Sequence, residues 1–236
     1  MARIFITGSS DGLGLQTAKQ LIQRGHSVVL HARSPQRARD ASAACPGNTA
    51  VLTGDLRSIP ETTALAAAAN AHGPYDAVIH NAGGLLRPDP GPPKRRVHVS
   101  SGLHFSGSYP PRSGSGGIVE SSYGDTKLHN VMLAKTFARR WQGEGVQCYA
   151  ADPGWVPTKM GGRAATGRME DGVATFVMLA LGEHVEGKGE AAVSGGYFAN
   201  SKEGRVAYAA GDEAMQDQLL AELATISGVA LPGTAE

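Results

Sequence analysis

A tyrosine and a lysine stand four residues apart at Tyr123 and Lys127, within a segment whose apolar spacing predicts a long helix. Residues four apart lie on one face of a helix, so both side chains can point at the same ligand. A phenol, with a pKa of about 10, is a poor acid or base at neutral pH. A nearby ammonium group favours the phenolate and brings that pKa toward the working range. The pair therefore suits general acid–base catalysis.

A glycine-rich turn near the start of the chain has the composition of a phosphate-binding loop. It follows a short apolar stretch, opens an amphipathic one, and carries Gly8, Gly12 and Gly14. Glycines let the backbone bend tightly and approach a pyrophosphate at the N-terminus of a helix. The spacing is neither G-x-G-x-x-G nor a Walker A loop. By itself it fits either a nucleotide site or an ordinary strand-to-helix turn.

The elements that would position these residues alternate between strand and helix. The predicted strands lie at 3–7, 27–31, 50–53, 76–80, 96–99, 146–150 and 197–199. Among the predicted helices are those at 35–44, 58–71 and 123–141, a helix around 173–180, and a last one over 215–226. Such alternation predicts a parallel sheet covered by helices on both faces. We expect an α/β fold, a Rossmann-type doubly wound parallel sheet of about seven strands. No repeat or linker divides the chain, so one domain is expected over 1–236.

Composition and charge exclude several classes of protein. Lys plus Arg number 22 and Asp plus Glu 21, which argues against nucleic acid or an anionic membrane as the main partner. The longest apolar run, 173–181, is too short to span a bilayer. Cys45 and Cys148 are too few for a disulfide framework and resemble no zinc site, so no metal is expected. Met1 leads almost directly into a predicted core strand, so we expect no signal peptide and a cytoplasmic location.

Five segments, in this order, resemble the short-chain dehydrogenase/reductase family. They are the glycine-rich turn, Asp55-Leu56, Asn81-Ala82-Gly83, Tyr123-x-x-x-Lys127, and Pro153-Gly154 with Thr158. The resemblance covers nearly the whole chain. It implies an oxidoreductase that transfers a hydride between a nicotinamide cofactor and a small carbonyl or alcohol substrate. In the family the tyrosine is the general acid/base, and the lysine also holds the nicotinamide ribose.

The resemblance also implies a cofactor-binding set. The expected residues are Gly8, Ser9, Ser10, Gly12, Leu13, Gly14, Arg33, Asp55, Leu56, Asn81, Ala82, Gly83, Tyr123, Lys127, Pro153, Gly154, Trp155, Val156 and Thr158. Asp55 would touch the adenine, although a turn or helix-cap role is its alternative. Residues 153–155 would wall the nicotinamide, Thr158 would bind its carboxamide, and the glycine-rich stretch 160–169 is expected to form a lid over substrate.

The end of the second predicted strand decides between NAD and NADP. An acidic residue there would accept a hydrogen bond from the ribose 2′-hydroxyl of NAD. Residues 30–34 read Leu-His-Ala-Arg-Ser, without a carboxylate. Arg33 can donate to a 2′-phosphate, and Ser9 or Ser10 can add a hydrogen bond. The sequence therefore predicts NADP(H).

In the family, a serine at the end of the fifth strand assists the carbonyl chemistry. Ser100 and Ser101 both stand at that place. The family's serine is usually the second of such a pair, so Ser101 completes the expected catalytic set with Tyr123 and Lys127, and Ser100 is held in reserve. The interval from Ser101 to Tyr123 is long and resembles that of retinol-dehydrogenase-like members. His104 within it could touch substrate, although a polar loop histidine is the plainer interpretation.

One part of the family pattern is missing. Family members place a long helix between the Asn-Ala-Gly strand and the serine-bearing strand, which carries a catalytic asparagine and helps to form a dimer. Here residues 84–94 make that connection, and their four prolines rule out a helix. Either the deletion between strands 4 and 5 is real, or the sequence lacks a segment that the protein carries.

A real deletion has consequences for packing, assembly and activity. It would leave one sheet face and the apolar side of the Tyr123 helix under-covered, and it puts the possible homodimer in doubt. A non-catalytic NADP-binding sensor or scaffold is then the alternative function. The presence of Ser101, Tyr123 and Lys127 together favours the enzyme, because a pure binder has no need of all three.

Overall fold

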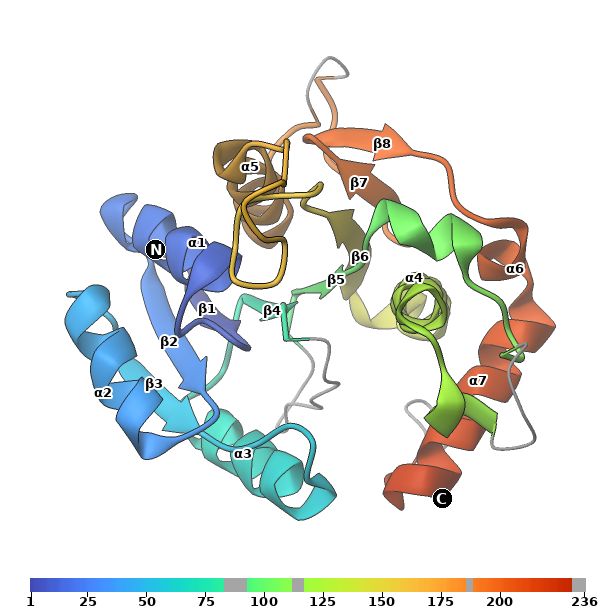
Figure 1. Ribbon diagram of the computed structural model, residues 1–236, viewed down its shortest axis with the longest axis horizontal. Helices are drawn as coiled ribbons and strands as arrows, with labels where there is room; N and C mark the ends of the chain where they lie inside the picture. Colours follow the sequence, from blue (N-terminus) through green and yellow to red (C-terminus); the bar gives the residue numbers. More distant parts are fainter. Residues whose placement is uncertain (83–92, 112–116, 186–188, 231–236) are drawn as a thin grey trace.

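The computed structural model describes residues 1–82, 93–111, 117–185 and 189–230. One sheet carries eight strands in the order β3-β2-β1-β4-β5-β6-β7-β8, parallel except for the antiparallel pair β7 and β8 (Figure 1). The strands are β1 (Arg3–Ile6), β2 (Ser27–Ala32), β3 (Ala50–Thr53), β4 (Ala77–His80), β5 (Arg95–Val99), β6 (Gln147–Asp152), β7 (Tyr197–Ala199) and β8 (Lys202–Gly204). The doubly wound parallel sheet is thus confirmed. The short edge strand β8 is an addition, because its sequence, Lys-Glu-Gly, has no apolar pattern.

The helices follow the predicted ranges closely. They are α1 (Gly12–Gln23), α2 (Pro35–Ala44), α3 (Ile59–Ala71), α4 (Tyr123–Arg140), α5 (Met169–Leu181), α6 (Tyr208–Gly211) and α7 (Glu213–Ser227), with the 3-10 turns η1 (Gly102–Ser106), η2 (Gly117–Glu120) and η3 (Gln142–Glu144). Helix starts are marked by side-chain caps at Ser34, Ser58, Ser122 and Asp212. These polar caps fix where the helices begin, and each is followed by a segment with apolar periodicity.

One face of the sheet is packed continuously. Alternate residues of β1, β2, β4, β5 and β6 point to it, and α1, α2 and α5 cover it with a single apolar cluster. Ile4, Leu30, Ile79 and Phe176 are fully buried within that cluster. This face supplies much of the core that holds the strand ends in place.

The other face is divided between two clusters. One lies under α3 around Phe5, and the other lies under α4, α6 and α7. Between them β4 and β5 present His80, Arg96 and His98, all buried. The Arg96 guanidinium lies 5.0 Å from the ring centroid of Trp141, and the two histidine rings stack at 4.8 Å. The expectation that this sheet face is under-covered is wrong for the described residues: the side chains of β4 and β5 on it are buried, and they are polar or charged.

Helix α7 covers the apolar side of α4. Figure 1 shows the two helices side by side, and Leu219 and Leu220 of α7 belong to the same buried cluster as Val131, Met132 and other residues of α4. The expectation that the Tyr123 helix is under-covered is therefore wrong as well. The C-terminal part of the chain packs against it; residues 83–92 of the connection between β4 and β5 lie outside the described residues.

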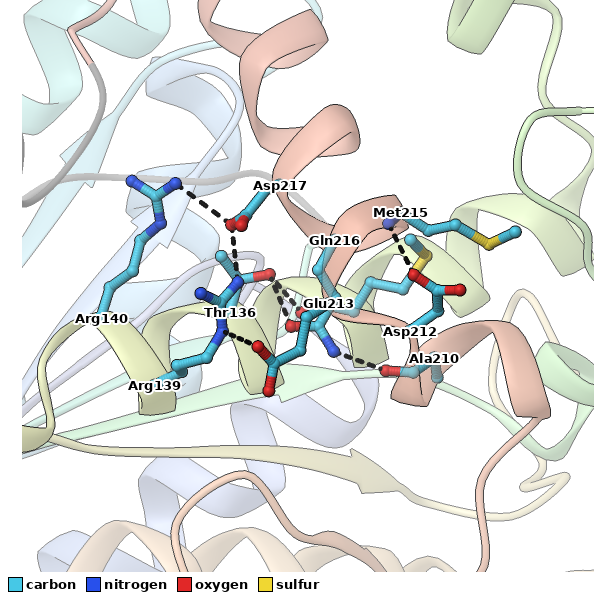
Figure 2. Close-up of polar contacts among 10 residues, drawn as sticks. Thr136, Arg139, Arg140, Ala210, Asp212, Glu213, Met215, Gln216 and Asp217 are labelled. Carbon is cyan, nitrogen blue, oxygen red and sulfur yellow. Dashed lines mark hydrogen bonds and ion pairs between the residues drawn. The ribbon is translucent and has the colours of Figure 1, made fainter.

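Polar contacts fix the position of α7 on α4 (Figure 2). The buried Gln216 amide donates to the carbonyl of Ala210 at 2.9 Å and lies 3.5 Å from the Thr136 hydroxyl. Arg139 and Arg140 donate to Asp217 at 2.6 and 3.1 Å. Although partial burial opposes the change, these hydrogen bonds lower the pKa of Asp217.

We expect the apolar contact of α7 to matter far more than its ion pairs. Leu219→Ala should destabilise the protein by about 2–5 kcal/mol, because it opens a cavity at a fully buried site. Asp217→Asn should cost less than about 1 kcal/mol, because the pairs are partly exposed to solvent. Since the Asp217 pKa is lowered on folding, that small contribution is present above the unfolded pKa and is lost as pH falls through the folded value. Urea unfolding of both variants at neutral pH checks this, and equal losses would contradict the ranking.

Candidate active site and nucleotide site

Tyr123 and Lys127 lie together at the first turn of α4. Ser122 and Asp125 form a capping box that sets where the helix begins. The Lys127 ammonium lies 5.2 Å from the centroid of the Tyr123 ring and donates to the carbonyl of Val99 at 3.2 Å. Tyr123 is 48% exposed and so is open to a ligand. The expected side-by-side arrangement of the pair is present in the structure.

The electrostatics of the pair differ from the simple expectation. Partial burial, together with the charge of Asp152, raises the pKa of Tyr123. Burial lowers the pKa of Lys127, and Asp152 acts against that shift. The cofactor-free protein therefore holds Tyr123 as a neutral phenol at neutral pH. The Lys127 charge alone does not bring the phenol into the working range; a cationic nicotinamide would have to add its field.

The two serines after β5 have different partners. Ser100 is buried, and its hydroxyl donates to the carbonyl of Lys127 at 2.8 Å, which ties β5 to α4. Ser101 is half-buried, and its hydroxyl oxygen accepts from the backbone N–H of Leu103 at 3.2 Å. Its own hydroxyl proton is thus not used in that bond and can be donated to a ligand. Geometry favours Ser101 over Ser100 as the residue that meets a substrate.

The glycine-rich turn is held tightly by its neighbours. Gly8 has a φ of +63°, and a Cβ there would lie 2.9 Å from the Cβ of Ala82. A Cβ on Gly14 would lie 2.7 Å from the Gly8 carbonyl and 2.8 Å from the side-chain nitrogen of Asn81. Asn81 donates to the carbonyls of Thr7 and Gly8, both at 3.0 Å. Asn81 and Ala82 therefore support the turn, and Gly83 lies outside the described residues.

Helix α1 begins without a side-chain cap. Its N-cap residue, Asp11, makes no capping bond and instead pairs with Arg37 at 2.6 Å and Lys159 at 3.0 Å. The first turn has no acidic residue. Helices α2, α3, α4 and α7 each have a capping side chain that accepts from a first-turn N–H. The first-turn N–H groups of α1, including that of Leu13, have no such side-chain cap. Such an N-terminus, beside two cationic side chains, fits a phosphate group.

The residues expected at the 2′-phosphate behave differently from one another. Ser9 is fully buried, donates to the carbonyl of Ile6 and accepts from the N–H of His31, so a side-chain contact from Ser9 to cofactor does not fit this geometry. Ser10 accepts from Arg37 at 2.9 Å. Arg33 is exposed at the end of β2. Sequence reasoning missed Arg37, although its place in the first turn of the predicted helix after Arg33 was a usable signal.

Asp55 and Leu56 follow β3. Asp55 accepts hydrogen bonds from the Arg57 guanidinium and from its backbone N–H, and these bonds lower the pKa of Asp55 to about 2. The carboxylate is therefore ionised, and the turn role that was the alternative for Asp55 is present. Leu56 packs at the edge of the α3 cluster.

The loop after β6 reaches the nucleotide turn. The Thr158 methyl group would lie 3.5 Å from a Cβ on Gly12, and Lys159 pairs with Asp11. The loop is folded on itself, since the Trp155 indole donates to the carbonyl of Gly161 at 3.0 Å. The remaining expected residues of this loop are Pro153 and Gly154, at its start, and the buried Val156. This placement is compatible with a wall of the cofactor site, which remains a prediction together with the lid.

Asp152 and Tyr197, which were not assigned to the site, contact each other across β6 and β7. Asp152, at the end of β6, accepts from the Tyr197 hydroxyl at 2.9 Å. His104, interpreted as a polar loop histidine, is fully buried in η1, and its ring lies 4.7 Å from that of Tyr197. The Asp-Pro-Gly segment was the available signal for Asp152. Contacts between β6, β7 and η1 depend on the tertiary structure, and no local sequence pattern predicts them.

Within the described ranges, no group of three His, Cys, Asp or Glu residues is arranged to hold a metal ion. In the same residues, no helix combines the length and the apolar character needed to cross a bilayer.

Comparison with known proteins shows the family of the chain. Residues 2–96 match the model of the family described as short chain dehydrogenase. An uncharacterized oxidoreductase of Emericella nidulans is 42% identical over 99% of this chain and 100% of its own length. The short-chain dehydrogenase chyC of Penicillium rubens is 38% identical over 98% of this chain and 100% of its own.

Solved structures share the fold. A blue fluorescent protein from a metagenomic library, in complex with NADPH, has a TM-score of 0.64 at 18% identity and covers 84% of this chain and 95% of its own. At that identity the likeness concerns the fold.

The alignment with the Emericella nidulans relative also bears on the missing helix. It spans 264 positions but includes only 99% of these 236 residues, so roughly thirty positions of the relative have no counterpart here. A deficit of that size agrees with the absence of a helix and its connections. With the ordered motifs, the sheet topology and a relative aligned along almost its whole length, the chain belongs to the short-chain dehydrogenase/reductase family of oxidoreductases.

Proposed function

We propose that this protein is an NADP(H)-dependent oxidoreductase that interconverts a carbonyl compound and an alcohol. The observation that carries the proposal is the placement of Tyr123, Lys127 and Ser101 at the carboxyl edge of β5, where α4 meets the sheet. Ligands of open parallel sheets bind at that edge. The uncapped start of α1 lies at the same edge and suits the pyrophosphate.

The chain's own residues can perform the proton chemistry. NADPH, when bound, would supply the hydride to the carbonyl carbon. The neutral Tyr123 phenol donates its proton to the carbonyl oxygen, and the Ser101 hydroxyl donates a hydrogen bond to the same atom. Lys127, held by the carbonyl of Val99, keeps a positive charge beside the phenolate that forms. Tyr123 then regains a proton from solvent.

Arg33 and Arg37 support NADP(H) rather than NAD(H). Both follow β2, where an acid would be needed for the 2′-hydroxyl of NAD. Arg37 is already oriented by Ser10, and Arg33 has an exposed guanidinium that can donate to a phosphate. The NADPH complex of the metagenomic structural neighbour is compatible with this choice.

The cofactor preference can be tested by binding. NADPH should bind more tightly than NADH, and Arg33→Ala should reduce the preference about tenfold or more, the effect of losing a charge-assisted hydrogen bond. Adding Arg37→Ala to Arg33→Ala should reduce the preference for NADPH further. Arg39→Ala is the matched control, because Arg39 bonds to Gln36 on the exposed part of α2. Calorimetric titration with both cofactors measures the ratio. Equal affinities in the unmutated protein would overturn the NADP(H) assignment.

Turnover tests the reaction. NADPH oxidation with a panel of aldehydes and ketones should show activity that depends on Tyr123. Tight NADPH binding without turnover on any carbonyl or alcohol would favour a non-catalytic NADP-binding sensor or scaffold.

A further inference from the structure

Two cations from different parts of the chain meet on one carboxylate at the nucleotide turn. The Oδ2 atom of Asp11 lies 2.6 Å from the Arg37 guanidinium and 3.0 Å from the Lys159 ammonium. Arg37 belongs to the first turn of α2, and Lys159 to the loop after β6. Although partial burial opposes the change, hydrogen bonds from Arg37 and Lys159 lower the pKa of Asp11. The carboxylate is therefore ionised at neutral pH and pairs with both cations.

The helix that follows Asp11 does not use its carboxylate. Asp11 is the N-cap residue of α1, a place where an aspartate ordinarily accepts from N–H groups of the first turn. Its side chain makes no such hydrogen bond. The two ion pairs are therefore what this side chain contributes in the cofactor-free protein.

The ion pair with Lys159 fastens the loop after β6 to the nucleotide turn. The loop has local hydrogen bonds of its own: the Gly161 N–H donates to the Thr158 hydroxyl at 3.0 Å, and the Gly162 N–H donates to the Thr158 carbonyl at 2.9 Å. In the part of the chain that the structure describes, the Asp11–Lys159 contact is the one ion pair that joins this loop to the glycine-rich turn. The pair therefore couples the loop to the place where a nucleotide would bind.

The same two cations suit a phosphate group. A phosphate carries more negative charge and more acceptor oxygens than a carboxylate, and it forms charge-assisted hydrogen bonds with arginine and lysine. The Lys159 side chain is 80% exposed and that of Arg37 is 30% exposed, so a ligand can reach both. The Ser10 hydroxyl oxygen accepts from Arg37 at 2.9 Å and keeps that guanidinium at the turn.

We propose that Lys159 is a phosphate-binding residue of the NADP(H) site, and that Asp11 holds it beside Arg37 until a cofactor phosphate takes the place of the carboxylate. The inference rests on the proposed function for its ligand. Its geometric basis, two cations on one carboxylate oxygen, is independent of that function. Because Lys159 and Arg37 share this oxygen, they are placed to bind the same phosphate, and we expect it to be the 2′-phosphate proposed for Arg37.

Lys159→Ala should weaken NADPH binding by roughly three- to tenfold, because one charge-assisted contact from an exposed side chain is lost. NADH, which has no 2′-phosphate, should lose less affinity. Calorimetric titration with both cofactors measures the two changes. Equal losses would also support a phosphate role, and would place Lys159 on the pyrophosphate that both cofactors carry. Arg39→Ala is the control, because it removes a cation of α2 that bonds to Gln36 instead of Asp11.

Asp11→Asn distinguishes competition with phosphate from a structural role. The amide keeps the shape of the side chain but not its charge, so both cations are released to the cofactor and its phosphate meets no like charge. We therefore expect NADPH to bind roughly two- to fivefold more tightly. The gain should be smaller in the Lys159→Ala background, because only Arg37 is then released. A structural role of Asp11 in the turn predicts weaker binding instead.

Hydrogen exchange tests the ion pair without cofactor. The amides of Gly161 and Gly162 report on the loop that Lys159 fastens. In the cofactor-free protein, Asp11→Asn and Lys159→Ala should each speed their exchange by roughly two- to fivefold, because the loop loses its ion pair to the turn. Arg39→Ala should leave their exchange unchanged.

The two measurements separate this inference from the proposed function. An NADPH affinity that Lys159→Ala changes no more than Arg39→Ala does would overturn the inference, and so would weaker NADPH binding by Asp11→Asn. Failure of the unmutated protein to bind either cofactor, with loop exchange altered as expected, would instead count against the proposed function alone.

Discussion

Tyr123→Phe is expected to lower turnover by about 10²- to 10⁴-fold, because the ring remains but the proton donor is removed. NADPH binding should stay close to that of the unmutated protein, since the phenol acts on the substrate oxygen. Steady-state rates and a calorimetric NADPH titration measure the two effects separately. If the Phe variant keeps more than a few per cent of the activity, the proton donor lies elsewhere.

Lys127 provides the contrasting variant. Lys127→Ala should damage both turnover and NADPH binding, because the resemblance places the lysine on the nicotinamide ribose as well as beside the phenol. Lys135→Ala is a matched control, because Lys135 lies on the same helix, more than one turn beyond Lys127. Equal effects of the two lysine substitutions would show that the loss comes from α4 and not from the site.

Gly14→Ala should abolish measurable NADPH binding and destabilise the fold by about 2 kcal/mol or more. The added Cβ would lie 2.7 Å from the Gly8 carbonyl and 2.8 Å from the Asn81 side chain, distances that force the turn to move. The shift displaces the first-turn N–H groups of α1 that would receive the pyrophosphate. Thermal unfolding and NADPH titration of the variant measure both losses.

Gly143→Ala is the control for that substitution. A Cβ at Gly143, in η3, would meet no atom within 4 Å, and its backbone does not need the left-handed region. The stability should change little, or rise slightly because the unfolded chain loses freedom. If Gly14→Ala behaves like Gly143→Ala, the close approach at the nucleotide turn is not a constraint on this protein.

Much of the fold was readable from local patterns. Apolar runs located β1 to β7, and the Ser58 capping box with apolar periodicity located α3, because caps and periodicity are properties of short segments. The strand β8 and the short helix α6 were not predicted, because three or four residues are too few to show an apolar periodicity. The spacing of Tyr123 and Lys127 likewise predicted their proximity, because one helical turn joins them.

Long-range contacts decided the rest. Local patterns do not show which surfaces meet. The expectation of an under-covered sheet face and Tyr123 helix was therefore wrong: polar residues are buried between α3 and α4, and α7 covers α4. The sequence by itself determined the motif order, the sheet and the identity of the Tyr–Lys pair. Only the tertiary structure showed that Ser100 is bonded to α4 and Ser9 is buried, that Arg37 is bonded to Ser10, and that Asp152 is bonded to Tyr197. Hydrogen-bond partners and local charge depend on residues distant in sequence, and folding alone brings them together.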